Sequence, residues 1–153
     1  MRDIPKNVYE EVRAEYEASL KIPRNKPKKQ FFVLPVGLVG AGKTTVMKPL
    51  AEKLSLLRIS GDEIRKILHN RALGYDSVWE VGKDLAEKYA KEGYSIAHDT
   101  DSANPKTIEL ATKMAEKLGV KLIWIHINPP EEFIINKLLN HKHTWLFRDE
   151  SKQ

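Results

Sequence analysis

The feature that most constrains this 153-residue chain is a glycine-rich run followed at once by lysine and threonine. The run matches the pattern G-x-x-x-x-G-K-[ST] without a mismatch, and a short apolar segment at 31–36 precedes it. Glycines let the backbone wrap so that several N–H groups point inward, and the helix expected next adds its positive N-terminal end. The residues predicted to hold phosphate groups are Gly37, Leu38, Val39, Gly40, Ala41, Gly42, Lys43, Thr44 and Thr45.

Two side chains of this run have predicted chemical roles. Lys43 would reach the β and γ phosphates of a nucleoside triphosphate, and Thr44 would offer its hydroxyl to Mg²⁺. The predicted co-substrate is therefore ATP, with Mg²⁺ as the cofactor.

Strand-like and helix-like segments alternate from residue 31 onward. Strands separated by helices of 10–15 residues indicate βαβ units. The predicted fold class is α/β, a three-layer αβα P-loop NTPase fold with a mostly parallel sheet of about four to five strands. The expected strands are 31–36, 56–60, 94–98 and 120–127, and the expected helices are 43–54, 62–69, 77–92, 104–118 and 131–140.

The N-terminal part is expected to be a helix followed by a basic linker. Asn7 would cap the helix, as Ser77 with Glu80 would form a capping box further along. The proposed division is residues 1–29 for this part and 30–153 for the main domain. The apolar residues expected to share one helix face are Val8, Val12, Tyr16 and Leu20.

An acidic residue follows the second expected strand, in Ser60-Gly61-Asp62-Glu63-Ile64-Arg65. In a parallel sheet, ligands bind at the carboxyl ends of the strands. Asp62 could accept a proton from a hydroxyl there, or hold Mg²⁺ through water. Arg65, one helical turn away, could grip an anionic group of an acceptor or the phosphate being transferred. The alternative is that Asp62 only caps the helix and that Arg65 is solvated.

A second acid, Asp99, follows the third expected strand. Mainly apolar positions followed by Asp are typical of a Walker B acid, which orders the water shell of magnesium. The fourth strand ends instead in Asn128, so Asp99 is the better candidate for the metal side. Asp101 lies close by, and the sequence leaves its role open.

These motifs together resemble a known group of proteins. The segments G-L-V-G-A-G-K-T-T, I-S-G-D-E-I-R and I-A-H-D look like those of the small P-loop kinases related to polynucleotide kinase, zeta toxin and gluconate kinase. The resemblance covers about residues 31–147. It implies that Asp62 is the base that activates the acceptor and that Arg65 binds the substrate.

The C-terminal part departs from this group. The resemblance implies a P-loop kinase domain over residues 30–153, with a lid at about 131–150 whose arginines close over the triphosphate. Here this stretch carries lysines, including Lys142, and its first arginine is Arg148. Lysine supplies charge but no bidentate fork. The four expected strands have no fifth after Arg148, which points to a truncated or a reduced version of the fold. Adenine recognition is therefore not assigned.

Composition adds a few limits. The chain has no cysteine and no apolar run near the length that spans a bilayer, and its start lacks an apolar signal core, which favours a cytoplasmic protein without membrane contact. Its net charge of +5 is concentrated at the two ends, so solvated tails are favoured over a nucleic-acid surface. His98 and His126 are expected to be packed and neutral, whereas Arg71 and Tyr75 are open candidates for an acceptor pocket.

Three functions follow from the sequence. The leading one is transfer of the γ-phosphoryl group of Mg-ATP to a hydroxyl of an unidentified acceptor, either a small molecule or a nucleic acid. The second is a nucleoside monophosphate kinase, although Asp99-Thr100-Asp101-Ser102 stands where that family has Gly-Phe-Pro-Arg. The third is a nucleotide-binding switch or ATPase. The acceptor, the preference between ATP and GTP and the oligomeric state are not determined by the sequence.

Overall fold

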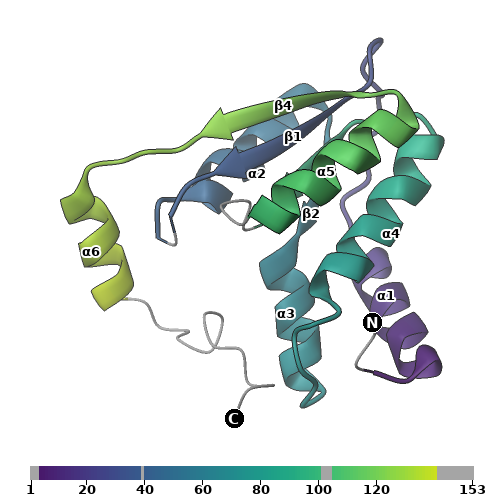
Figure 1. Cartoon of the computed structure of the whole chain (residues 1–153), viewed down its shortest axis with the longest axis horizontal. Coiled ribbons are helices and arrows are strands. Elements are labelled where there is room, and N and C mark those ends of the chain that lie inside the picture. Colours follow the sequence, from purple (N-terminus) through teal and green to yellow (C-terminus); the bar gives the residue numbers. More distant parts are fainter. Residues whose placement is uncertain (1–3, 39, 101–104, 141–153) are drawn as a thin grey trace.

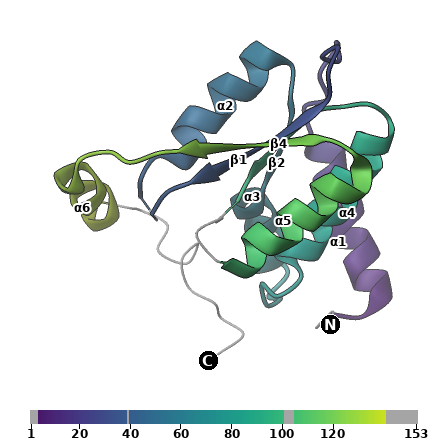
Figure 2. The same cartoon turned by 45° about the horizontal axis from the view of Figure 1, so that its top comes forward.

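The fold is known from a computed structural model, which describes residues 4–38, 40–100 and 105–140. Its central feature is a parallel sheet of four strands in the order β2-β3-β1-β4 (Figures 1 and 2). The strands are β1 (Phe31–Val36), β2 (Leu57–Ser60), β3 (Ile96–Asp99) and β4 (Lys121–His126). The helices are α1 (Lys6–Ser19), α2 (Lys43–Leu54), α3 (Gly61–Asn70), α4 (Val78–Lys91), α5 (Pro105–Leu118) and α6 (Glu131–Leu139).

The helices form layers on both faces of the sheet. Helix α2 covers one face, and α4 and α5 cover the other, with α1 packed outside them on α3 and α4 (Figures 1 and 2). The predicted αβα class and its parallel sheet are confirmed; the bounds of β1 and α2 are as expected, and those of the other elements differ by one or two residues. Among the described residues, no helix has both the length and the apolar character needed to cross a membrane.

The order of the strands determines which residues meet at the carboxyl edge of the sheet. Strand β3 lies between β1 and β2, so that Ser60 at the end of β2 is level with Asp99 at the end of β3. The phosphate-binding run follows β1, the other neighbour of β3. The three sequence motifs are therefore brought to one edge, as expected for parallel strands.

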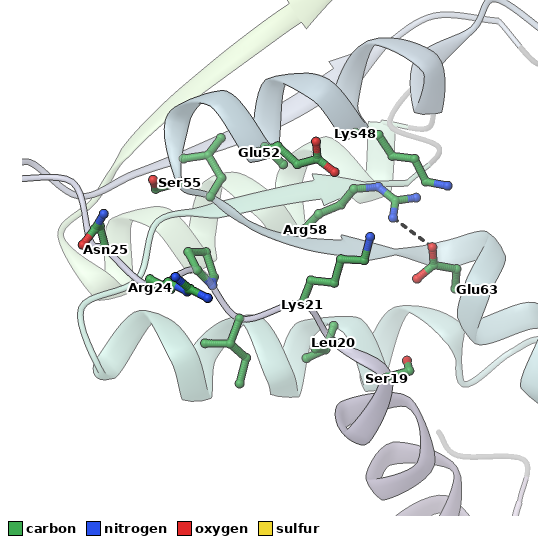
Figure 3. Close-up of a pocket in the computed structure, with 14 residues that line it drawn as sticks. Ser19, Leu20, Lys21, Arg24, Asn25, Lys48, Glu52, Ser55, Arg58 and Glu63 are labelled. Carbon is green, nitrogen blue, oxygen red and sulfur yellow. Dashed lines mark hydrogen bonds and ion pairs between the residues drawn. The ribbon is translucent and has the colours of Figure 1, made fainter.

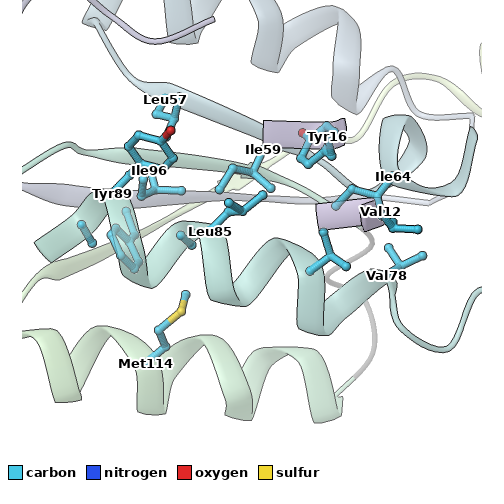
Figure 4. Close-up of a cluster of buried hydrophobic side chains, with 14 of the residues drawn as sticks. Val12, Tyr16, Leu57, Ile59, Ile64, Val78, Leu85, Tyr89, Ile96 and Met114 are labelled. Carbon is cyan, nitrogen blue, oxygen red and sulfur yellow. The ribbon is translucent and has the colours of Figure 1, made fainter. Parts of the chain in front are cut away.

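Most of the hydrophobic core lies on the α4 and α5 face. Side chains from α1, β2, α3, α4, β3 and α5 form one cluster there, which includes Tyr16, Ile59, Leu85, Ile96 and Met114 (Figure 4). A smaller cluster on the other face joins α2 to β1 and β3, with Met47 fully buried. Helix α6 contributes no buried residue to either cluster.

Helix α1 is part of this core. Val12 and Tyr16 are buried, and Val8 and Leu20 are partly buried against the same core, so the predicted apolar face is confirmed; Tyr9 is a further buried residue of the helix. The Tyr16 hydroxyl also accepts a bond of 2.6 Å from the backbone N–H of Ser60, at the end of β2. The N-terminal helix therefore supports the strand that carries the first acidic motif.

Two predicted caps are wrong. Helix α1 begins at Lys6 after Pro5, so Asn7 lies inside the helix and does not cap it. Ser77 does precede α4, but its side chain makes no capping bond, because its φ and ψ of −84° and −4° are helical. An N-cap residue normally takes extended dihedrals to aim its oxygen at the helix, which Ser77 does not.

Candidate phosphate-transfer site

The phosphate-binding run forms a turn between β1 and α2. Gly40 and Gly42 have φ values of 82° and 89°, a left-handed conformation that favours glycine, and Gly42 directly precedes the first residue of α2. The Lys43 ammonium donates a 2.9 Å bond to the carbonyl of Gly37, so the side chain folds back over the turn. This is the strand, glycine turn and helix order that the motif requires. Val39 lies outside the described residues.

Gly37 is required for a different reason. A Cβ atom at this position would lie 2.7 Å from the carbonyl oxygen of Ile127, just after β4. Real Cβ atoms essentially never approach a backbone oxygen so closely. A glycine is therefore needed where the first turn of the loop passes the chain leaving β4.

Asp99 is buried at the end of β3, with 5% of its surface exposed. The Thr44 side chain forms a hydrogen bond to its carboxylate, which joins the phosphate-binding run to the second acid. Burial raises the pKa of Asp99 above its ordinary value, and the charge of Arg58 and the bond to Thr44 oppose that shift. The sequence had placed both Thr44 and Asp99 on the metal side, and the structure brings them into contact.

Arg58 is a site residue that sequence reasoning missed. Its Nε and Nη2 both lie 3.0 Å from Oδ2 of Asp99, and its Nη1 donates a 2.8 Å bond to Oε1 of Glu63. Only 14% of the Arg58 side chain is exposed. The available signal was a single arginine within the otherwise apolar segment Leu56-Leu57-Arg58-Ile59, since a half-buried cation in a strand requires a nearby acid.

Asp62 lies in the first turn of α3. The cap of this helix is Ser60, whose hydroxyl accepts a 3.4 Å bond from the N–H of Glu63, so Asp62 is not the capping residue. The Asp62 side chain is half exposed, and its Oδ1 accepts a 2.8 Å bond from Nη1 of Arg65. The predicted pairing of these two residues is therefore present, and it faces solvent.

The two acids lie close enough to influence each other. The negative charge of Asp62 adds to the upward shift in the pKa of Asp99, as a minor contribution after burial. The starts of α3 and of the loop after β3 are also in contact, because a Cβ added at Gly61 would lie 3.3 Å from Oγ1 of Thr100. One carboxylate is thus exposed and the other buried within the same small region. Asp101 lies outside the described residues.

Helix α6 packs on the phosphate-binding run. A Cβ added at Gly40 would lie 3.1 Å from Cγ of Leu138, and one added at Gly42 would lie 3.8 Å from Nζ of Lys137. Lys137 is therefore the described cation of the lid region that lies nearest the loop glycines, and sequence reasoning did not select it. The predicted lid residues Lys142 and Arg148 lie outside the described residues.

Other candidates are resolved by their contacts. His98 is buried and stacks on Trp79 with 5.1 Å between ring centroids, and burial lowers the pKa of His98 to about 4, so the expected packed, neutral histidine is confirmed. His126 is exposed, and its expected packing is wrong because β4 is an edge strand. Arg71 bonds Glu11 and Glu15 of α1, which joins the end of α3 to α1. Its guanidinium is therefore engaged by α1 and not by Asp62 or Asp99.

The donor atoms present suit a magnesium ion. Magnesium prefers oxygen ligands and keeps several of its waters, so one hydroxyl from the first turn of α2 and one carboxylate from the end of β3 form a suitable set. Thr44 and Asp99 supply these two groups and already contact each other. Among the described residues, no three His, Cys, Asp or Glu side chains are grouped to hold a metal ion by themselves.

The loop, the parallel sheet and the acid on the strand beside β1 define a small P-loop domain. Comparison with known families agrees with this class. A family model described as an AAA domain matches residues 32–144, which is well over half of the chain, and the chain belongs to that family. No curated protein matches its sequence.

Solved structures with the same fold include proteins of the group identified by resemblance. A structure of the PezAT toxin-antitoxin system of Streptococcus pneumoniae aligns with a TM-score of 0.70 at 18% identity, over 97% of this chain and 68% of that one. The Pnkp1/Rnl/Hen1 RNA repair complex gives 0.62 at 13%, over 74% and 38%. The APS kinase CysC of Mycobacterium tuberculosis gives 0.55 at 18%, over 83% and 78%. At these identities the similarity establishes the fold.

Proposed function

We propose that this protein is an ATP-dependent phosphotransferase that moves the γ-phosphoryl group of Mg-ATP to a hydroxyl group of an acceptor. The observation that carries the proposal is the placement of an exposed carboxylate, Asp62, beside a buried one, Asp99, that contacts the phosphate-binding run through Thr44. A domain that only bound or hydrolysed a nucleotide would need no exposed acid paired with an arginine at this edge.

The phosphate-binding run supplies binding and charge. The N–H groups around Gly40 and Gly42 and the start of α2 attract the phosphate oxygens. Lys43 would exchange its bond with the Gly37 carbonyl for contacts with the β and γ phosphates. Phosphoryl transfer depends mostly on positioning and electrostatic stabilisation, so this group contributes much of the rate.

Asp62 is proposed as the general base. The acceptor oxygen attacks the γ phosphorus while the bond from that phosphorus to the β–γ bridging oxygen breaks, and ADP leaves with the bridging oxygen. The acceptor hydroxyl proton passes to the Asp62 carboxylate. Arg65, already bonded to Oδ1 of Asp62, would orient this carboxylate and attract an anionic group of the acceptor.

Thr44 and Asp99 are proposed to hold the metal side of the site. When bound, magnesium neutralises charge on the β- and γ-phosphate oxygens. Asp99 suits this position because Arg58 and Thr44 fix its carboxylate in one orientation before any ligand arrives. Lys137, close to the loop, is proposed to add positive charge over the triphosphate in place of a lid arginine.

Product analysis with γ-labelled ATP tests this function. The purified protein would be incubated with labelled Mg-ATP and separate pools of sugars, nucleosides, nucleotides and 5′-hydroxyl oligonucleotides, and the labelled products would be separated by chromatography. A labelled acceptor other than a nucleoside diphosphate is the expected result. Labelled nucleoside diphosphate would indicate the monophosphate kinase, and free phosphate alone would indicate an ATPase or a switch.

A further inference from the structure

A cavity of about 410 Å³ lies along the free edge of β2, on the α2 side of the sheet (Figure 3). One wall comes from residues 19–25, the end of α1 and the beginning of the strap that leads to β1. The opposite wall comes from α2, and Arg58 and Glu63 close the end nearest the two acids. Cavities of this volume are typical of small-molecule sites. The phosphate-transfer chemistry described above makes no use of it.

The charged side chains of this cavity are mostly cationic. Two lysines, two arginines and two glutamates line it. Arg58 already engages Glu63 at 2.8 Å, which neutralises one of the glutamates. In Figure 3 the ammonium groups of Lys21 and Lys48 approach the same end of the cavity from opposite walls, on either side of Arg58. Neither lysine forms an ion pair with any residue that the structure describes, so converging positive charge is left to attract an anion.

The rest of the lining is largely apolar. Leu56 and Ala51 are buried at the base, and Leu20 and Pro23 of the opposite wall are partly buried. A small inorganic ion would leave this part of the cavity unused. A molecule that joins one anionic group to a compact apolar or ring-shaped body matches both halves of the lining.

We propose that this cavity binds a small organic anion, whose charged group is held by Lys21 and Lys48. Its apolar body lies against Leu20, Pro23 and Leu56. The site is separate from the phosphate-binding run, which belongs to the turn between β1 and α2.

The cavity is connected to the phosphate-transfer site through Arg58. This side chain contacts the cavity residue Glu63 through Nη1 and Asp99 through Nε and Nη2. An anion beside Arg58 would offset its charge, which otherwise opposes a divalent cation near Asp99. Mg-ATP should then bind more tightly when the cavity is filled, and by linkage the anion should bind more tightly when Mg-ATP is present. This coupling rests on the proposed metal-side role of Asp99; the binding itself does not.

Calorimetric titration with phenyl phosphate tests the site, because this probe joins one phosphate to one ring. The double variant Lys21→Gln/Lys48→Gln should bind it roughly tenfold more weakly or worse, since two charged contacts are lost. Lys28→Gln/Lys53→Gln removes one exposed lysine from the strap and one from α2, both outside the lining, and is the matched control that should bind normally. Circular dichroism would verify that all variants are folded.

A third variant separates the two phosphate sites. Lys43→Ala should leave phenyl phosphate binding unchanged if the probe occupies the cavity. Loss of binding in Lys43→Ala but not in Lys21→Gln/Lys48→Gln would place the probe in the phosphate-binding run and overturn the proposal. Equal binding by Lys21→Gln/Lys48→Gln and by its control variant would also overturn it, and so would absence of binding by the wild type. The coupling is measured as the Mg-ATP dissociation constant with and without the probe, which should fall roughly fivefold. An unchanged constant would overturn the link through Arg58, whereas absent phosphoryl transfer would contradict only the proposed function.

Discussion

One aspartate lies at the end of β3 and another lies just after β2, and the two side chains have opposite surroundings. Asp99 of β3 is buried, bonded by Arg58 and Thr44, and its pKa is raised above the ordinary value mainly by burial. Asp62, two residues after β2, is half exposed, and Arg65 is the one described residue that bonds its carboxylate. The same residue type, at one strand end and just beyond the neighbouring one, therefore occupies one fixed position and one accessible position.

The difference follows from the local fold. Ser60 caps α3, so the helix begins before Asp62 and directs the aspartate outward. Asp99 is still part of its strand and lies between the neighbouring strands β1 and β2. A fixed carboxylate suits the orientation of a metal and its waters, and an accessible one suits an incoming acceptor. Each prediction below tests one side of this comparison.

The largest expected effect concerns the accessible acid. Asp62→Asn keeps the shape and removes the charge, so phosphoryl transfer should fall by roughly 10²–10⁴-fold, the usual contribution of a general base. ATP affinity should stay close to that of the wild type, because the Asp62 carboxylate bonds Arg65 and no described residue of the phosphate-binding run. Transfer rates and ATP dissociation constants would be measured side by side. Wild-type transfer by this variant would show that Asp62 is structural.

Lys43→Ala removes the positive charge that the phosphate-binding run is proposed to direct at the γ-phosphoryl group. Loss of one electrostatic donor to the γ-phosphoryl group should cost about 3–4 kcal/mol in transition-state stabilisation, which is roughly a 10²–10³-fold loss of turnover. The fold should remain, since the ammonium bonds a carbonyl of the loop itself, that of Gly37. Single-turnover kinetics would measure the loss, and a near wild-type rate would contradict the role of the loop.

The closed surroundings of the β3 end can be tested through His98, the neighbour of Asp99. The pKa of His98 is about 4 in the folded protein, against an ordinary value of 6.5. Between about pH 6.5 and pH 4, His98 therefore binds a proton in the unfolded chain but stays neutral in the folded protein. Stability should fall as the pH drops from about 6.5 to about 4, by up to about 3 kcal/mol.

Urea unfolding of the wild type and His98→Leu between pH 7.5 and pH 4.5 would measure this contribution. The free energy of unfolding should depend less steeply on pH in His98→Leu. His126→Gln, at an exposed position of β4, is the matched control. Equal slopes for the wild type and His98→Leu would mean that His98 is open to water and that the end of β3 is not closed.

The smallest expected effect is thermal. ATP with Mg²⁺ should raise the melting temperature more than ATP with EDTA, because a ligand that binds only the folded state stabilises it by ~2.7 kcal/mol at a hundredfold excess over its dissociation constant. Differential scanning fluorimetry would compare the two conditions at one ATP concentration. Identical shifts in melting temperature under the two conditions would contradict the assignment of Thr44 and Asp99 to the metal site.

Local sequence patterns predicted much of the fold. The glycines of the phosphate-binding run, the apolar β-forming segments and the helices between them gave the order of elements and the parallel sheet, because each depends on neighbours in sequence. The two wrong cap predictions also came from local sequence patterns. Asn7 and Ser77 are good capping residues, but packing of α1 and the turn before α4 decided the dihedrals at those positions.

Contacts between distant segments were less accessible from sequence. Asp62 and Arg65 are three residues apart on a helix, so their pairing was predictable. Arg58 and Asp99 are 41 residues apart and meet only because β2 and β3 are adjacent. Lys137 likewise reaches the loop because α6 packs on Gly40 and Gly42. The cavity beside β2 depends on the path of the strap, which no periodic pattern specifies.

The division between the two acids is tested most directly by titrating ATP at several magnesium concentrations into Asp62→Asn and Asp99→Asn. Isothermal calorimetry gives the ATP dissociation constant at each magnesium concentration. The account predicts that Asp62→Asn retains the magnesium dependence of the wild type and that Asp99→Asn loses most of it. If Asp62→Asn disturbs the magnesium dependence while Asp99→Asn preserves it, the fixed and accessible acids have the opposite roles and the account is contradicted.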